Sequence, residues 1–206
     1  RDLPSFPPRR SSDLEGHTLQ TTTQMAFWLR PREKSAGNPA KNTTELSNHL
    51  LKKRVTIGYR DMPNVLQYDV TFGLPANEHH RYAQFEAVTG YLPDTFSRFY
   101  SFSPATGTVN ALSDGPGEQS KPVILSTQSG SHAMGIYSPD QPSPGCERAG
   151  SGRWRFIPPR VAKWNCVFRI RNDDGLEPGD YSYRSLVIIG ELDAVVATMV
   201  KLHKAD

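Results

Sequence analysis

A strict alternation of apolar and polar residues over positions 65–74 is the clearest fold signal in the chain. The apolar positions alternate with Gln67, Asp69, Thr71 and Gly73, and a period of two is typical of a half-buried antiparallel strand. Alternation returns at 82–89, after a loop at 75–81. We expect the two runs to pair as a hairpin. The apolar residues of the first run are Leu66, Tyr68, Val70, Phe72 and Leu74.

Short strand patterns continue on both sides of this segment. They lie at 21–29, 44–59, 96–102, 122–127, 132–138, 162–171 and 181–189, separated by turns rich in Gly, Pro, Asn and Asp. Segments 44–59, 66–74 and 82–89 are predicted to form a meander, and 122–127 with 132–138 a second hairpin. Residues 191–204 change to a helical period. We therefore predict an all-β, antiparallel β-sandwich, super-sandwich-like and incomplete, with one C-terminal α-helix.

The first fourteen residues contain three prolines and no usable period. Residues 5–14 resemble the in-frame translation of a common sequencing adapter, so we expect residues 1–14 to be an artefact. A natural disordered arm is the alternative. We interpret 15–206 as a single sandwich domain that has lost part of its N-terminal side.

Charge and hydropathy narrow the possible partners. The net charge is +3, of which three arginines and two aspartates in residues 1–14 supply +1, and no dense basic face alternates with aromatics. These features argue against a nucleic-acid partner. No apolar run approaches the length of a membrane span, so we expect a soluble domain that does not bind membranes. The sequence leaves localisation and oligomeric state open.

The cysteines and the histidine-rich loop do not form a recognised metal motif. Cys146 falls in a loop, and Cys166 falls on the apolar face of a strand, where we expect a small buried residue. Glu78, His79 and His80 were considered as ligands, but adjacent loop residues point in different directions. We therefore expect neither a metal nor another cofactor.

Acid–base chemistry has three candidates in this sequence. Glu86 shares a strand face with Tyr82 and Gln84, and either His80 or His132 could act as its partner. Each has a structural alternative. Glu86 can be a solvent-facing residue of a half-buried strand, and His132 a hydrogen-bonded structural histidine.

Six segments carry a family resemblance: TQMAFWL, LSNHLLKKRVTIGY, VLQYDVTF, HHRYAQFEAVTGYLP, SHAMGIYSPD and KWNCVFRI. In this order they resemble the later part of uncharacterised bacterial proteins similar to the galactose mutarotase-like super-sandwich. The resemblance implies a carbohydrate-facing groove. Epimerases of that superfamily use a histidine acid and a carboxylate base, but the motifs here carry no catalytic residue across.

Three functions therefore remain open. The first is a non-catalytic carbohydrate-binding domain, in which aromatic side chains stack on sugar rings and polar side chains bind hydroxyls. The second is a mutarotase- or lyase-like enzyme, and the third is an accessory domain without a ligand. Convergence of Glu86 with His80 or His132 in a concave pocket would favour the enzyme. The binding candidates are Trp28, Tyr91, Trp154 and Trp164 for stacking, with Gln84, Glu86 and Arg169 for hydrogen bonding. For Trp28, core packing is the favoured alternative.

Overall fold

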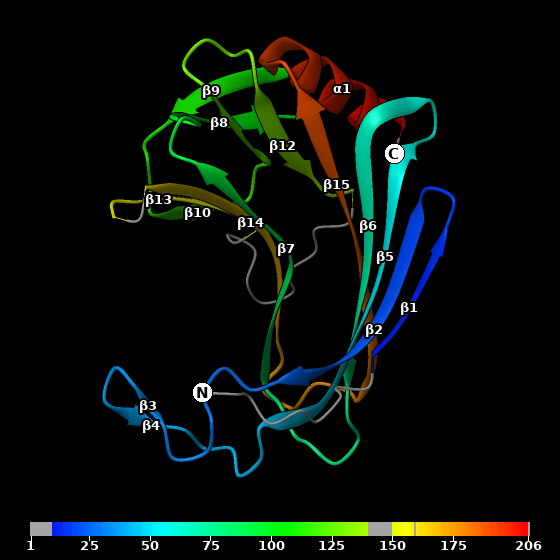
Figure 1. The fold of residues 1–206 in the computed structure, drawn as a ribbon, viewed down its shortest axis with the longest axis vertical. Helices are drawn as coiled ribbons and strands as arrows, with labels where there is room; N and C mark the ends of the chain where they lie inside the picture. The colour runs from blue at the N-terminus through cyan, green and yellow to red at the C-terminus, as the bar shows by residue number, and fades with distance from the viewer. Residues whose placement is uncertain (1–9, 140–149, 159, 206) are drawn as a thin grey trace.

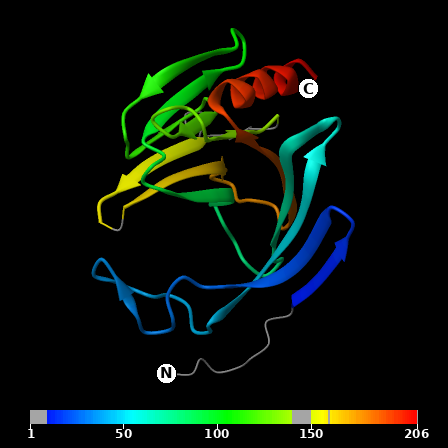
Figure 2. The same ribbon diagram turned by 45° about the horizontal axis from the view of Figure 1, so that its top comes forward.

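The computed structural model describes the backbone of residues 10–139, 150–158 and 160–205 as two facing antiparallel sheets with one helix (Figure 1). The large sheet has nine strands in the order β1-β2-β5-β6-β15-β12-β11-β8-β9, and the small sheet has four in the order β10-β13-β14-β7. Figures 1 and 2 show the large sheet curving around the small one. The predicted all-β sandwich with a C-terminal helix is confirmed.

The large sheet comprises β1 (Arg10–Glu15), β2 (Thr18–Ala26), β5 (Leu46–Tyr59), β6 (Met62–Leu74), β8 (Arg98–Ser103), β9 (Thr108–Leu112), β11 (Val123–Ser126), β12 (Ala133–Tyr137) and β15 (Gly179–Gly190). The small sheet comprises β7 (Tyr82–Pro93), β10 (Gly117–Gln119), β13 (Ser151–Phe156) and β14 (Val161–Arg171). A separate ribbon pairs β3 (Lys34–Ser35) with β4 (Asn38–Pro39), and α1 spans Leu192–Ala205.

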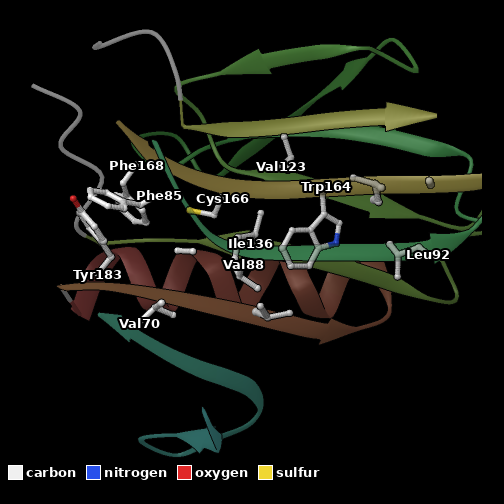
Figure 3. Packing of buried hydrophobic residues seen from close by; sticks show 14 of the residues in the cluster. Val70, Phe85, Val88, Leu92, Val123, Ile136, Trp164, Cys166, Phe168 and Tyr183 are labelled. Atoms are coloured by element: carbon white, nitrogen blue, oxygen red, sulfur yellow. The ribbon is translucent and has the colours of Figure 1, made fainter. Parts of the chain in front are cut away.

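The main core lies between the two sheets (Figure 3). Val70 and Phe72 of β6 are buried there, and Tyr68 packs against the same cluster. The alternation predicted for this strand is therefore confirmed. Aromatic rings join the layers, since Phe168 of β14 stacks on Tyr183 of β15 with ring centroids 4.0 Å apart. Burial of such rings supplies much of the apolar area that holds the sheets together.

A second core lies under α1. Val195, Met199 and Leu202 are fully buried on one face of the helix, as the helical period predicted. They pack with residues of β12 and β15, so the helix covers the side of the large sheet that faces away from the small sheet (Figures 1 and 2). Within the described residues, no helix is long and apolar enough to cross a membrane.

The predicted pairing of 66–74 with 82–89 is wrong. β6 lies between β5 and β15, and β7 pairs with β14 of the other sheet. The loop at 75–81 therefore crosses between layers and does not close a hairpin. Both strands bury one face, but a period of two says nothing about which strand is the partner. The hairpins β5–β6 and β11–β12 are confirmed.

Two further expectations needed correction. Residues 10–14, expected to carry no element, belong to β1, which pairs with β2. In β7, a bulge at Ala87 shifts the register, so Val88 faces the core and Thr89 faces outward. Glu86 keeps the face it was predicted to share with Tyr82 and Gln84, because all three precede the bulge. The expected site residues at the start of β7 are thus on one face.

Candidate functional site

A groove of about 420 Å³ runs along the open edge of β7. β7 pairs with β14 on one side, and no described strand pairs with its other edge. This edge faces β2, β5 and β6 of the large sheet, so the groove has one wall from each sheet. Residues from both faces of β7 line it because they flank the strand's exposed edge. The lining comprises Met25, Ala26, Phe27, Trp28, Ser47, His49, Leu50, Phe72, Gly73, Leu74, His80, Tyr82, Ala83, Gln84, Phe85 and Glu86.

Exposed aromatic side chains mark the groove. Trp28, just beyond the end of β2, is 92% exposed, and Tyr82 at the start of β7 is 42% exposed. The favoured alternative of core packing for Trp28 is therefore wrong. The strand pattern that predicted its burial stops at Ala26, and the chain leaves the sheet before Trp28. An indole in water leaves its faces available for stacking.

Glu86 is held by three neighbours on the outer face of the small sheet. Lys163 Nζ lies 3.0 Å and Asn165 Nδ2 3.1 Å from its Oε1, and the Thr89 hydroxyl donates to the same oxygen. Burial raises the pKa of Glu86, but these hydrogen bonds and the charge of Lys163 outweigh it and hold the pKa below its usual value. Glu86 is thus an ionised hydrogen-bond acceptor at neutral pH and a weak base.

Gln84 lies next to Glu86 on the same face, in a second polar network. Its Oε1 accepts hydrogen bonds from Arg169 Nε at 2.9 Å and from the Tyr82 hydroxyl at 3.0 Å. Arg169 also forms a bidentate pair with Glu118, with both contacts at 2.8 Å. Such paired contacts fix the guanidinium plane, and through it the Gln84 amide. With Oε1 occupied, the Gln84 amide group presents its N–H donors.

The histidines divide between two places. His80 lines the groove, as does Glu86, but no hydrogen bond joins the two among the described residues. His132 is exposed in the turn between β11 and β12, where its Nδ1 lies 3.0 Å from Ser131 Oγ, and it does not line the groove. The structure therefore does not bring His132 to Glu86.

The loop at 75–81 holds a cluster that sequence reasoning missed. Glu78 Oε2 lies 2.9 Å from His80 Nε2 and 3.4 Å from Nε2 of His49, on β5. His79, which had been considered with Glu78 and His80, instead packs over Gly175. A signal for His49 existed in the β5–β6 register, because pairing Leu50 with Gly73 brings the preceding residue to the start of this loop.

The remaining stacking candidates lie outside the groove. Trp164 is 2% exposed in the main core, so its predicted sugar contact is wrong (Figure 3). Tyr91 is 66% exposed on the outer face of the small sheet, next to the partly buried Trp154, and Lys163 Nζ lies over both rings. These two rings would form a binding surface distinct from the groove.

The two cysteines have separate outcomes. Cys166 is buried between the sheets, as predicted, and burial raises the pKa of its thiol to about 12. Such a thiol is unreactive at neutral pH. Cys146 lies outside the described residues, as does most of the loop predicted at 141–153.

Comparison with known proteins does not assign the chain to a family. No protein-family model matches it, and no curated protein matches its sequence. Among solved structures it is similar to the α-galactosidase from Lactobacillus brevis, at 11% identity and a TM-score of 0.48, over 93% of this chain and 26% of that one.

Two GH36 α-galactosidases from Geobacillus stearothermophilus are also similar. AgaB has 8% identity and a TM-score of 0.46, over 88% of this chain and 25% of its own. AgaA, solved with stachyose, has 9% identity and a TM-score of 0.46, over 89% and 25%. The chain thus spans about a quarter of the length of these enzymes. The resemblance to the galactose mutarotase-like super-sandwich stays a prediction.

Proposed function

We propose that this chain binds carbohydrate in the groove along β7 without transforming it. The observation that carries the proposal is the almost fully exposed Trp28 at a groove that also contains Gln84 and Glu86. Sugar rings present apolar C–H faces and a rim of hydroxyls. An aromatic platform beside fixed polar groups suits both features.

The polar groups are positioned before any ligand arrives. Arg169 holds Gln84, and Asn165 and Lys163 hold Glu86. A preorganised donor and acceptor cost little ordering entropy on binding, which favours even a modest affinity. The ionised Glu86 suits acceptance of hydrogen bonds from two sugar hydroxyls better than proton abstraction.

A glycan array probed with the whole chain tests the proposal. We expect binding to a subset of glycans, and loss of that binding in Trp28→Ala. Ile57→Ala is the matched control, because Ile57 is 60% exposed on β5 and does not line the groove. Binding by this control shows that loss of any exposed apolar side chain is not the cause.

Three results separate the alternatives. Binding lost in Tyr91→Ala and kept in Trp28→Ala would move the site to the outer face of the small sheet and overturn the groove. Faster exchange of sugar anomers, lost in Glu86→Gln, would favour the mutarotase alternative. No glycan binding and no effect on anomers would leave the accessory domain.

A further inference from the structure

We propose that His49, Glu78 and His80 form a binding site for a divalent transition-metal ion, with Zn²⁺ as the ion to test first. The three residues offer two imidazole nitrogens and one carboxylate oxygen, all within 4.8 Å of one another. This proposal concerns a site beside the groove and does not depend on carbohydrate binding.

The distances are close to those of a metal centre. Zn²⁺ bonds to nitrogen and oxygen at about 2.0–2.2 Å, so ligand atoms around a tetrahedral ion lie about 3.3–3.5 Å apart. Here Glu78 Oε2 lies 3.4 Å from His49 Nε2 and 2.9 Å from His80 Nε2. The widest separation, at most 4.8 Å, would have to close by at most about 1.5 Å on binding. Rotation of side chains suffices for such a change.

The backbone holds the ligands in place. His49 lies within the paired part of the large sheet, on β5. The loop that carries Glu78 and His80 is tied to the chain between β14 and β15, because the amide of Leu176 donates to the carbonyl of His80 at 2.7 Å and the amide of Asn172 to that of Arg81 at 3.0 Å. A rigid support reduces the cost of assembling a metal site.

The ligand set selects the class of metal. Imidazole nitrogens favour Zn²⁺ and its transition-metal neighbours, whereas Mg²⁺ and Ca²⁺ favour sets made only of oxygens. Side-chain exposures of 22% for His49, 26% for Glu78 and 34% for His80 leave the cluster open to an entering ion. His49 and His80 also line the groove, so a fourth position of the ion would be accessible from it.

An ordinary hydrogen-bonded cluster is the competing explanation. A carboxylate that accepts a hydrogen bond from one or two imidazoles would show similar contacts without binding any metal. The two explanations differ in one measurable quantity, the affinity for added Zn²⁺.

Titration of the tag-free chain with Zn²⁺, by calorimetry and by competition with a chromogenic chelator, measures that affinity. We expect one ion per chain. His49→Ala, Glu78→Gln and His80→Ala should each weaken binding by more than about a hundredfold, because loss of a mere supporting partner already costs about 10–100-fold. His79→Ala is the matched control and should bind as the wild type does, since His79 is next to two of the ligands but outside the cluster.

Zn²⁺ binding that is equally strong in His49→Ala and His79→Ala would overturn the proposal, as would the absence of stoichiometric binding. Circular dichroism establishes that each variant folds. If His49→Ala does not fold, X-ray absorption by the Zn²⁺-loaded wild type decides. Two imidazole nitrogens among the ligands support the site, and thiolate or purely oxygen ligands overturn it.

Discussion

Gly90 on β7 provides the sharpest test of how the small sheet packs on the core, and hence of where the groove lies. A Cβ atom at this position would lie 2.4 Å from Cε2, 2.6 Å from Cζ2 and 2.7 Å from Nε1 of Trp164. Favourable contacts between such atoms lie at about 3.5–4.0 Å, so in Gly90→Ala the ring or β7 must move by about 1 Å. The ring is 2% exposed, so it has little room to move.

The expected penalty combines two terms. Overpacking of a core costs about 1–3 kcal/mol, and contact with three atoms of a buried rigid ring favours the upper end. Removal of a strand glycine returns about 0.5–1 kcal/mol, because alanine loses less conformational freedom on folding. The net loss in the free energy of unfolding is then about 2 kcal/mol. For a urea m-value of about 2 kcal/mol/M, the unfolding midpoint falls by about 1 M.

Urea unfolding followed by circular dichroism measures this shift, with Gly190→Ala as the matched control. Gly190 ends β15, and a Cβ there would meet its nearest side-chain atom at 3.7 Å, an ordinary contact. We expect this control to change stability by less than about 0.5 kcal/mol. Equal midpoints for Gly90→Ala and Gly190→Ala would refute the packing of Trp164 on β7.

Three further predictions follow from single side chains. In Cys146→Ser, we expect Cys166 to resist thiol reagents at pH 8 until the chain unfolds, because burial raises its pKa to about 12; rapid labelling of the native chain would contradict its burial. The lowered pKa of Glu86 means that its contribution to stability is present above its unfolded-state value of about 4.5 and is lost as the pH falls through the folded value. The melting temperature of Glu86→Gln should therefore depend less on pH in that acidic range, and identical profiles would refute the network. Gly175→Ala should lower stability by about 1–3 kcal/mol in urea unfolding, because Gly175 has a φ of +114° and its Cβ would lie 2.5 Å from His79 Cε1; an unchanged midpoint would refute the loop's conformation.

The alternation of apolar residues predicted most strands and their buried faces. Tyr68, Val70 and Phe72 face the main core as their spacing requires, and the helical period at the C-terminus gave α1. These features are local: a strand that buries one face has to place apolar residues at every second position. A helix over a sheet likewise has to carry an apolar stripe.

Strand partners could not be obtained in this way. Segment 82–89 pairs with β14, about eighty residues further along the chain, because the sandwich needs a second layer over the core. The bulge at Ala87 also changes which residues face inward, and alternation alone does not reveal a bulge. Short strands such as β10 and β13 lack a long enough pattern to be recognised.

The candidate site was only partly predictable for the same reason. Tyr82, Gln84 and Glu86 share a short uninterrupted strand segment, so their common face could be read from the sequence. Trp28 and His49 reach the groove through the end of β2 and the β5–β6 register, which depend on tertiary structure. Trp164 shows the reverse error, since a tryptophan considered for sugar stacking forms part of the core.

Amide chemical-shift mapping, with the best glycan from the array added to the ¹⁵N-labelled chain, tests the central claim most directly. The account predicts perturbed signals from the Trp28 indole and from the amides of residues 47–50, 72–74 and 80–86, which line the groove. Perturbations confined to Tyr91, Trp154 and Lys163 on the outer face of the small sheet would contradict it.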